Sequence, residues 1–375
     1  MFRVFFFIFM IAGFSSHGQE LALARTDGQF GFVNTSGEWH IKPQFKDAKS
    51  FSDDLTEAMN DDKSWGYINR KGEWVIKPQF KDVKAFHSGI ALATDGDDWF
   101  YIDKSGNKTL AQVQTDKFYD FSDGMAIIRN GDLVGFINTQ GAVVVQPKFE
   151  KAFPFQNGHS KVLEGGKWGL IDKTGAYLVK TEYDGIGQVA NGPVIAEMGS
   201  SKGLIIDGQF KEIPGAEKIW DFTSAEGLAF VKKDGQLGFI DTQGNWVIEP
   251  QFDKVKDFSN GLAPVMKDKK WGYIDTNGQV IIDYQFKDAE TFSKDGLAPV
   301  KPSKLWGFID KKGNLVIEDK YDISSVNFGA LFGATEDKGF IDGLSRVKLK
   351  KEWAFIKPNG EVLGNTWFEN LELFK

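Results

Sequence analysis

Cysteine is absent from this chain of 375 residues. Its absence excludes disulfide bonds, thiolate metal ligands, a cysteine nucleophile and a lipid-modified cysteine. A chain of this length can bury a core large enough to fold without disulfides. Histidine is scarce as well, and its four positions do not have the spacing of metal ligands: His17, His40, His87 and His159. The sequence therefore predicts no metal and no other cofactor.

Positive charge and long hydrophobic runs are also lacking. The net charge of −7 argues against nucleic acid and anionic lipid as partners, because both require a positive surface. The apolar stretch 4–14 is shorter than the roughly 20 residues that cross a bilayer. It follows Arg3 and precedes Ser15, Ser16 and Gly18, as in a secretory signal. We interpret residues 1–18 as a signal peptide, and we expect residues 19–375 to be exported to the periplasm, cell surface or exterior, without a membrane span.

A repeat of about 35 residues fills the rest of the chain. Its anchor is an aromatic-Gly-aromatic-Ile step or a degraded form of it. The anchors are spaced by 34 or 35 residues as far as Trp306, and the last gap is 47. The ten anchors are Phe30, Trp65, Trp99, Val134, Trp168, Lys202, Leu237, Trp271, Trp306 and Trp353. Ten units leave no space for a linker or a second domain.

Each unit is predicted to contain three or four antiparallel strands. In the unit after Gly261, the segments GLAPVMKDKK, WGYID and QVIIDYQF are the strands, and Asp275–Gly278 is a tight turn. Asp or Asn at the first turn position can accept a backbone hydrogen bond, and Gly at the fourth can take a left-handed conformation. The turn recurs as NTSG (34–37), NRKG (69–72), DKSG (103–106), NTQG (138–141), DKTG (172–175), DTQG (241–244) and DKKG (310–313). These acids are interpreted as turn residues.

The strand pattern predicts where each side chain points. In WGYID, Trp and Tyr share one face, and Gly allows a neighbouring backbone to come close. The last strand, as in VVVQPKF from Val143, is apolar on both faces, which predicts that both are covered. The segments FKDVKAF (80–86) and FDKVKDF (252–258) are interpreted as a bend or short fourth strand. Two units depart from the repeat pattern. In the sixth unit, Asp207-Gly208 predicts a two-residue hairpin. In the ninth unit, about twelve extra residues lie between Tyr321 and Trp353, and they are interpreted as an inert loop or as a binding element.

The pattern W-G-[YF]-I-D-x-x-G-x-x-[VI]-I-x-P-x-[FY] resembles the WG-repeat family of bacterial proteins. The pair is intact at Trp65-Gly66, Trp168-Gly169, Trp271-Gly272 and Trp306-Gly307. It is degraded at Trp99-Phe100, Val134-Gly135, Lys202-Gly203, Leu237-Gly238 and Trp353-Ala354. The resemblance covers residues 20–375 and implies a β-rich repeat, often exported. It implies no established activity, so no catalytic, cofactor-binding or metal-binding residues are carried over.

The sequence contains only weak signals for a catalytic, metal-binding or ligand-binding site. Asp95, Asp97 and Asp98 resemble part of a calcium loop, but a solvated hairpin turn fits better. Paired carboxylates for glycoside hydrolysis are defined by distance in space, and no acid here stands out from the repeat. The aromatic residues can bind sugars or partners, but regular spacing favours packing for Trp65, Trp168, Trp271 and Trp306. Trp220 and Trp367 lie off the pattern.

We therefore expect an all-β array of ten antiparallel meanders that stack on one another, as propeller-like blades or as an open superhelical array. The first and tenth units begin and end in the same phase, so the sequence shows no strand exchange that would close a ring. For function, the sequence favours a non-enzymatic binding or scaffolding protein of the bacterial cell envelope, with a protein or glycan partner. The alternatives are a carbohydrate-active enzyme or glycan-binding protein with a site in the repeat cleft, and a structural spacer.

Overall fold

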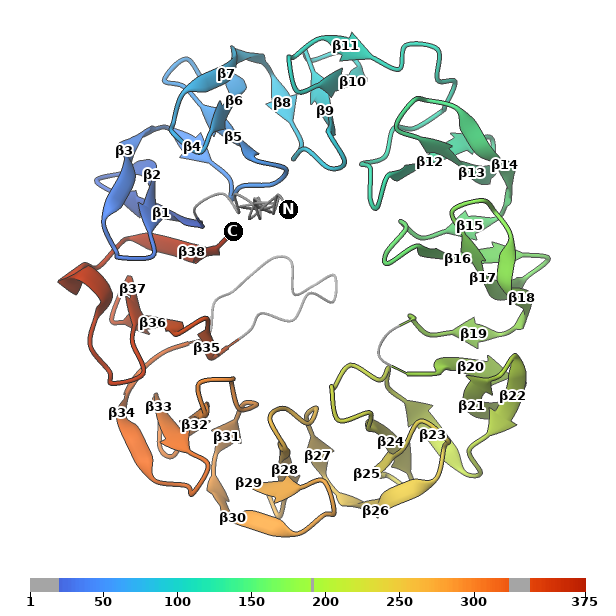
Figure 1. Ribbon diagram of the computed structural model, residues 1–375, viewed down its shortest axis with the longest axis vertical. Coiled ribbons are helices and arrows are strands. Elements are labelled where there is room, and N and C mark those ends of the chain that lie inside the picture. The colour runs from blue at the N-terminus through green and yellow to red at the C-terminus, as the bar shows by residue number, and fades with distance from the viewer. Residues whose placement is uncertain (1–19, 190–191, 324–337) are drawn as a thin grey trace, which may run out of the picture.

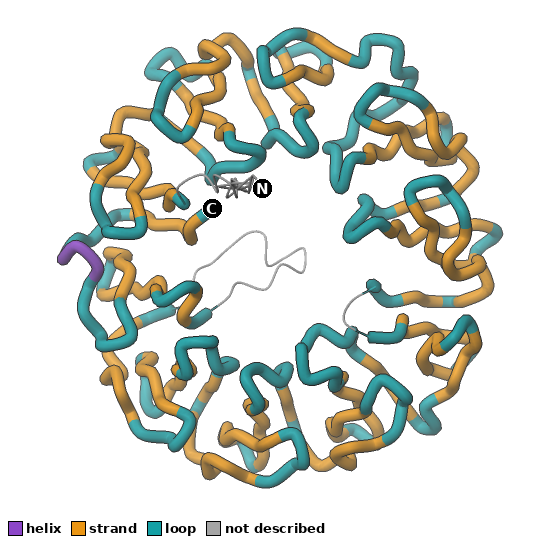
Figure 2. Tube along the Cα trace, in the orientation of Figure 1, coloured by secondary structure: helices purple, strands orange, loops and turns teal. Residues whose placement is uncertain are grey.

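The ten units form a closed ring of ten antiparallel sheets, which is a ten-bladed β-propeller (Figure 1). The structure is a computed structural model that describes residues 20–189, 192–323 and 338–375. Within these residues the helical element is the short 3-10 helix η2 (Leu363–Asn365), and strands and loops make up the rest of the ring (Figure 2). The prediction of an all-β propeller is confirmed. The expected signal peptide and most of the insertion between Tyr321 and Trp353 lie outside the described residues.

The blades share one strand order, and most have four strands. The first strands are mostly short: β4 (Asp47–Ala48), β8 (Asp82–Val83), β15 (Lys151–Ala152), β19 (Gly185–Ile186), β23 (Ala216–Ile219), β27 (Lys254–Val255), β31 (Asp288–Ala289) and β35 (Phe340–Ile341). The second strands are β1 (Leu21–Thr26), β5 (Leu55–Met59), β9 (Ile90–Thr94), β12 (Met125–Asn130), β16 (His159–Glu164), β20 (Val194–Met198), β24 (Ala229–Lys233), β28 (Leu262–Lys267), β32 (Leu297–Lys301) and β36 (Leu344–Leu349). These short first strands include both segments that the sequence assigned to a bend or a short fourth strand.

The third strands carry the ten anchor residues, and the fourth strands lie at the outer rim (Figure 1). The third strands are β2 (Gln29–Asn34), β6 (Trp65–Asn69), β10 (Trp99–Asp103), β13 (Leu133–Asn138), β17 (Lys167–Asp172), β21 (Ser201–Ile206), β25 (Gln236–Ile240), β29 (Lys270–Asp275), β33 (Trp306–Asp310) and β37 (Glu352–Ile356). The fourth strands are β3 (Trp39–Phe45), β7 (Trp74–Phe80), β11 (Lys108–Thr109), β14 (Val143–Phe149), β18 (Tyr177–Tyr183), β22 (Gln209–Glu212), β26 (Trp246–Phe252), β30 (Val280–Phe286) and β34 (Leu315–Tyr321).

A strand from the end of the chain closes the ring. β38 (Asn370–Phe374) pairs antiparallel with β1 and supplies the first strand of blade 1. The expectation that the sequence contains no strand exchange is therefore wrong. The closing strand follows the tenth anchor after a turn and η2, so it lies outside the phase of the repeat. Closure leaves no blade with an unpaired neighbour, which an open array would have at both ends.

The side chains of the WG step fill the space between consecutive blades. Trp65 and Tyr67 pack in one cluster with Ala91, Ala93 and Ile102 of the next blade. Ile68, on the opposite face, joins Phe32 and Ile41 of the previous blade. A Cβ added at Gly66 would lie 2.4 Å from the carbonyl oxygen of Ile76, so the glycine is required for β6 to pack against β7. The predicted assignment of faces and the predicted close approach are confirmed.

Hydrogen bonds along the inner ends of the strands link one blade to the next. The hydroxyl groups of Ser52, Ser122 and Ser259 each donate to a backbone carbonyl 33 or 34 residues ahead, at 2.7 Å. The acceptors are the carbonyl oxygens of Phe86, Phe155 and Phe292. The buried hydroxyl groups of Tyr67, Tyr101 and Tyr273 likewise donate to carbonyls 17 or 18 residues ahead. Repeated polar groups of the units are therefore used to hold the ring together.

The predicted turns are present with the expected geometry. The Asn34 side chain accepts hydrogen bonds from the backbone of Ser36 and Glu38, and Gly37 has a φ of +82°. Asp207 and Gly208 form the predicted two-residue hairpin between β21 and β22, both with positive φ. These acids build turns, as the sequence indicated.

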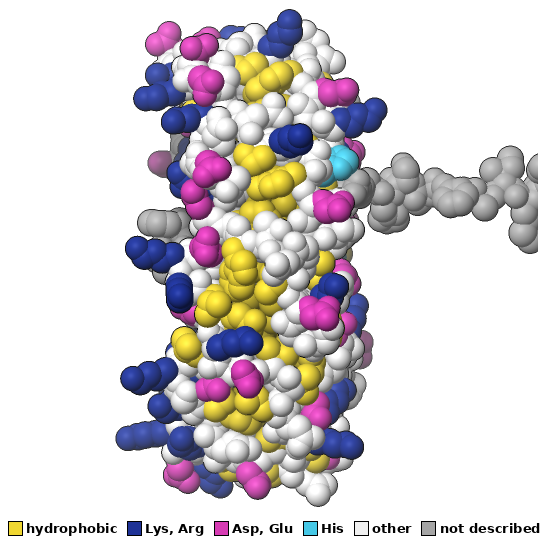
Figure 3. Space-filling model, turned by 90° about the vertical axis from the view of Figure 1, so that its left-hand side faces the viewer, with side chains coloured by type: hydrophobic (Ala, Val, Ile, Leu, Met, Phe, Trp, Pro, Cys, Tyr) yellow, Lys and Arg dark blue, Asp and Glu magenta, His cyan; other side chains and the backbone are white. Residues whose placement is uncertain are grey.

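The fourth strands are covered on one face, so the expectation that both faces are covered is wrong. In β14, Val143 is 45% exposed and Val144 37% exposed, whereas Val145 and Phe149 are buried. An edge strand at the outer rim has no sheet beyond it to cover its outer side chains. Figure 3 shows patches of hydrophobic side chains along the rim, flanked by charged ones. Leu178, Ile281, Leu315 and Val316 are further exposed apolar residues of these strands.

Candidate functional site

A cleft of about 860 Å³ lies between blades 3 and 4. We refer to it as the 3/4 cleft. One wall is formed by blade 3, with Lys84, Leu92 and Asp97–Trp99. The other wall is the segment from Thr115 to Asp120, which precedes β12. The volume falls within the range of pockets that hold small ligands, roughly 300–1,000 Å³.

The cleft lies where the repeat fails. The fourth strand of blade 3, β11, ends at Thr109, and residues 110–121 form no strand. Blade 4 has no first strand, because Thr115–Asp120 runs as a loop where other blades have the short first strand. The corresponding sequence, TLAQVQTDKFYDF from Thr109, lacks the I-x-P-x-F pattern that builds a fourth strand elsewhere. The altered sequence thus shortens the fourth strand of blade 3 to the two residues of β11 and replaces the first strand of blade 4 by a loop. This loop contacts blade 3 through Phe118, whose ring lies 5.2 Å from that of Tyr101.

The lining of the 3/4 cleft combines aromatic rings with charges of both signs. Trp99 is half-buried and, like Phe118 and Leu110, packs against the buried cluster that contains Tyr101. The Lys84 ammonium lies 5.8 Å from the centre of the Trp99 ring, and the Lys117 ammonium lies 5.1 Å from that of Tyr119. Four carboxylates, Asp97, Asp98, Asp116 and Asp120, face these two ammonium groups, so the lining has a net charge of −2.

A buried acid lies next to this charge cluster. Glu57 of β5 is 5% exposed, and its Oε2 has no hydrogen-bond partner. The pKa of Glu57 is raised to about 7, mainly by burial and in smaller part by the charge of Asp120, while a backbone hydrogen bond, Lys49 and Lys84 oppose the rise. Asp120 also adds to the rise that burial imposes on the pKa of Tyr101. Glu57 can therefore carry a proton near neutral pH.

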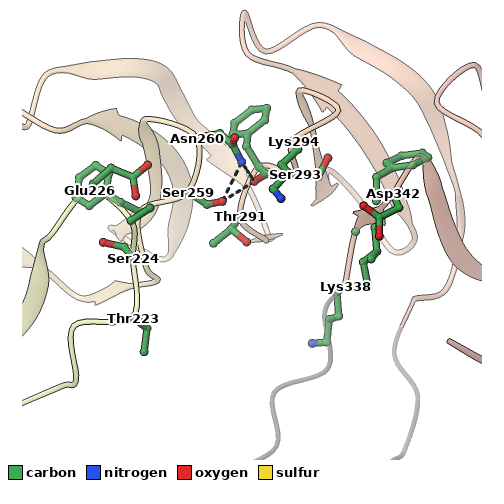
Figure 4. Close-up of a pocket in the computed structure, with 16 residues that line it drawn as sticks. Thr223, Ser224, Glu226, Ser259, Asn260, Thr291, Ser293, Lys294, Lys338 and Asp342 are labelled. Atoms are coloured by element: carbon green, nitrogen blue, oxygen red, sulfur yellow. Dashed lines mark hydrogen bonds between the residues drawn. The ribbon is translucent and has the colours of Figure 1, made fainter. Parts of the chain in front are cut away.

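A second pocket, of about 480 Å³, lies between the loops of blades 7 to 10 (Figure 4). We refer to it as the inner-rim pocket. Ser224, Ser259 and Ser293 come from equivalent loops of three blades, and Lys338 and Asp342 come from the tenth unit (Figure 4). The inner-rim pocket is therefore lined by equivalent loops of successive blades.

Most polar groups of the inner-rim pocket are already used by the ring. Ser259 donates to the carbonyl of Phe292, and Asn260 donates to Ser259 and to the same carbonyl (Figure 4). Thr223 donates to Asp257 at 2.6 Å, and the backbone of Gly261 donates to Glu226 at 2.8 Å. Burial, and to a lesser extent Glu226, raises the pKa of Asp257. One oxygen of each of these two carboxyl groups is buried without a hydrogen-bond partner.

The histidine and aspartate residues that were candidates for a metal or catalytic site lie apart in the structure. His40 is exposed at the rim, whereas His87 and His159 lie in different blades. Asp95, Asp97 and Asp98 lie in the exposed turn between β9 and β10, as predicted. Among the described residues, no three His, Asp or Glu side chains are placed to hold a metal ion. These residues do not form one centre, although Asp97 and Asp98 line the 3/4 cleft.

The tryptophans divide into packed and partly exposed residues. Trp65, Trp271 and Trp306 are buried between blades, so the packing interpretation is confirmed for them. Trp168 is half-buried and contacts Phe153. Trp220 stacks on Phe230 with 4.7 Å between ring centres and lines a smaller cleft of about 430 Å³ between blades 6 and 7. Trp367 packs against the cluster that contains Trp306.

The sequence analysis missed the segment 110–121 and the cleft that it opens. The signal was present, because the third unit keeps its turn at 103–106 but lacks the apolar strand that should follow. The partnership of Glu57 with Asp120 had no signal, since the two residues are in different blades. Within the described residues, no helix is both long and apolar enough to cross a bilayer.

Comparison with known proteins identifies the repeat. The family model described as WG containing repeat matches residues 30–63, 65–97, 99–133, 135–168, 168–199, 238–271, 271–301 and 306–323. Together the eight matches cover more than half of the chain. No curated protein is similar enough to this chain to count as a match.

Several solved structures are similar at low sequence identity. A crystal structure titled as the eukaryotic initiation factor has a TM-score of 0.49 and 12% identity, and covers 95% of this chain and 98% of its own. BamB from Moraxella catarrhalis has a TM-score of 0.30 and 11% identity, with 92% of this chain and 90% of its own covered. Hsv2 from Kluyvelomyces marxianus has a TM-score of 0.29 and 11% identity, with 65% and 88% covered. Similarities at this level carry no argument about function.

Proposed function

Because the chain belongs to the WG containing repeat family, whose units here build a closed scaffold, we propose that it is a non-enzymatic binding protein of the bacterial cell envelope. The 3/4 cleft holds the ligand. The observation that carries the proposal is the break in the repeat around residues 110–121, where the fourth strand of blade 3 is shortened and blade 4 has no first strand. A cleft of about 860 Å³ lies there beside a half-buried tryptophan. Elsewhere the repeated Ser and Tyr hydroxyls bind the next blade, so they are not available to a ligand.

The envelope location rests on the N-terminal sequence. Residues 4–14 are apolar, Arg3 precedes them, and small residues follow, which is the pattern of an export signal. The test is to fractionate cells that express the full chain and to detect the protein by antibody. The wild-type chain is expected outside the cytoplasm, and Ile8→Asp, which places a charge in the apolar stretch, is expected to keep the protein in the cytoplasm. Equal recovery of both chains in the cytoplasm contradicts the location.

Binding is tested with the purified protein and polysaccharide extracted from the cell envelope. We expect the immobilised wild-type chain to retain this material, and Trp99→Ala together with Tyr119→Ala to lose most of it, because these changes remove the rings of the cleft. Ser36→Ala, an exposed turn residue far along the chain, is the control and should retain it fully. Retention that is equal in all three proteins places the ligand elsewhere and overturns the proposed site.

A second candidate is a carbohydrate-active enzyme that uses Glu226 of the inner-rim pocket and Asp257, which lies behind the lining and accepts a hydrogen bond from Thr223. The observation in its favour is the pair of carboxyl groups with buried, unpartnered oxygens, one of which influences the pKa of the other. The same envelope polysaccharide, incubated with the protein, distinguishes the two. New reducing ends that disappear in Glu226→Gln establish the enzyme and overturn the non-enzymatic proposal. An unchanged chain-length distribution supports binding alone.

A further inference from the structure

We propose that the ligand of the 3/4 cleft is a neutral oligosaccharide. This inference rests on the proposed binding function and names the class of ligand. It is drawn from the aromatic rings, the carboxylates and the net charge of the cleft lining. A pyranose ring presents apolar C–H groups on its face and hydroxyl groups around its edge, so its site requires both aromatic and polar groups.

The aromatic part of the site is the indole of Trp99 with the rings of Phe118 and Tyr119. In blades 2, 8 and 9 the equivalent tryptophan is closed off: Trp65 is 8% exposed, Trp271 6% and Trp306 3%. Trp99 is half-buried, as is Trp168 of blade 5, and Trp99 lines the 3/4 cleft. Tyr119 is held by two hydrogen bonds. Its backbone carbonyl accepts one of 2.7 Å from the Tyr101 hydroxyl, and its own hydroxyl accepts one of 3.3 Å from Arg129. A ring held in this way can stack without further loss of side-chain entropy.

The polar part of the site consists of hydrogen-bond acceptors with a few donors. Ionised carboxylates only accept hydrogen bonds, and sugar hydroxyls donate them. Asp97 and Asp98 lie on the blade 3 side, and Asp116 and Asp120 lie on the facing segment. Asp116 uses one oxygen to accept a 2.7 Å hydrogen bond from the backbone of Gly131. Lys84 and Lys117 border the rings and can donate to sugar oxygens.

The net charge of the cleft disfavours an anionic ligand, and the positions of its two lysines disfavour a cation on the aromatic faces. With four carboxylates and two ammonium groups, the lining repels an anionic ligand such as a polyuronate. The aromatic faces already have lysines close to them, at 5.8 Å for Trp99 and 5.1 Å for Tyr119, so a cationic ligand would have to displace a like charge. A neutral ligand avoids both costs. We therefore infer an uncharged chain of sugar units.

The test is isothermal titration calorimetry of the full-length purified protein with defined oligosaccharides. The probes are cellohexaose, chitohexaose and maltohexaose as neutral chains, and hexagalacturonate as an anionic chain. We expect at least one neutral chain to bind with a Kd of about 1 mM or tighter, and hexagalacturonate to bind at least roughly tenfold more weakly at low salt. Trp99→Ala should weaken the neutral ligand roughly tenfold or more. Trp220→Ala, in the smaller cleft between blades 6 and 7, is the matched control and should change Kd by less than about twofold.

Folding is monitored separately, by circular dichroism and thermal unfolding of each variant. If Trp99→Ala is destabilised, Asp98→Asn tests the same cleft, because Asp98 lines the cleft and is exposed. The inference is overturned if no neutral chain binds at about 10 mM, if Trp99→Ala and Asp98→Asn both bind as tightly as wild type, or if hexagalacturonate binds equally well.

The same data separate this inference from the proposed function. Trp99-dependent retention of envelope material without binding of any neutral chain leaves the binding function standing and overturns the ligand class. If the protein neither retains envelope material nor binds a neutral chain, both the proposed function and the ligand class are overturned. Neutral chains that bind and are shortened support the ligand class and overturn the non-enzymatic function.

Discussion

Leu21 and Lys375 exchange two backbone hydrogen bonds, of 3.1 and 3.2 Å, across the two ends of the described chain. Nearby in β38, Leu371 is fully buried in the cluster between blades 10 and 1, while Leu373 is half-buried. The closure of the ring therefore depends on one short strand. Its energetics can be tested at a single side chain.

Leu371→Ala should lower the free energy of unfolding by about 2–5 kcal/mol, because the substitution leaves a cavity at the closing strand. The measurement is urea unfolding followed by circular dichroism. Leu178→Ala is the matched control, since Leu178 is 51% exposed at the rim and its loss should cost less than about 0.5 kcal/mol. Equal effects of the two substitutions would show that the closing strand does not limit stability.

Replacing the hydroxyl groups that join neighbouring blades should weaken the ring in even steps. Each of Ser52→Ala, Ser122→Ala and Ser259→Ala removes one 2.7 Å hydrogen bond and should cost about 1 kcal/mol. The triple variant should lose roughly 3 kcal/mol, because the sites are in separate blades and their effects add. Ser36→Ala, in an exposed turn, is the control. A triple variant with the stability of wild type would rule out a structural role for these bonds.

Gly66→Ala should be strongly destabilising, by more than about 2 kcal/mol, because the new methyl group would lie 2.4 Å from a backbone oxygen that cannot move aside. Gly339→Ala is the comparison, since the nearest atoms to its Cβ are side-chain atoms of Pro299 at 3.7 Å. Its effect should stay within about 1 kcal/mol. Differential scanning calorimetry of both variants measures the difference, and similar melting temperatures would contradict the close-approach argument.

Stability should depend on pH through Glu57. The folded protein holds the proton of Glu57 up to about pH 7, whereas the unfolded chain releases it near the usual value of 4.5. The folded state thus binds more protons between these values, so stability should fall by roughly 3 kcal/mol as pH rises through that window and then level off. Glu57→Gln should remove this slope.

The measurement for Glu57 is urea unfolding at a series of pH values from about 4.5 to 8. Glu73→Gln, which changes an exposed acid in a turn, serves as the control and should keep the wild-type slope. Parallel profiles for wild type and Glu57→Gln would show that the carboxyl group is not the source of the pH dependence.

The tryptophans should differ in their effect on stability. Trp271→Ala should cost about 3–5 kcal/mol, because the ring is 6% exposed between two blades. Trp99→Ala should cost less than half as much, since the ring is half-buried at the edge of the 3/4 cleft. Urea unfolding compares the two. A larger loss for Trp99→Ala would assign that residue to the core.

The repeat allowed much of the fold to be predicted, because every unit solves the same packing problem. The alternation in WGYID placed Trp65 and Tyr67 on one face, and the Asn34 and Asp275 turns were recognised from their first and fourth residues. Ring closure could not be predicted, because β38 contributes to blade 1 from outside the repeat phase. The outer faces of the fourth strands were misassigned, since apolar residues such as Val144 also tolerate an exposed edge.

The candidate site was less accessible to sequence reasoning. The weak pattern of residues 109–121 is visible in the sequence, but it does not predict that this segment, although it contacts Tyr101 of blade 3, leaves a cleft beside Trp99. The effect of Asp120 on Glu57 acts between blades 2 and 4, across blade 3, and such proximity has no periodic signal. The role of residues that depart from the repeat is therefore determined by their position in the folded ring.

The pairing of β38 with β1 also has a consequence for the order of events during synthesis. A ribosome produces Ala22 and Ala24 before the other nine blades, but their partners at 370–374 emerge only after those blades. Until then the earliest sheet keeps an open hydrogen-bonding edge, and a nascent molecule that meets another could pair with it instead. Ring closure is thus a late event in folding. A chaperone that covers β1 would protect the nascent chain from pairing with another copy.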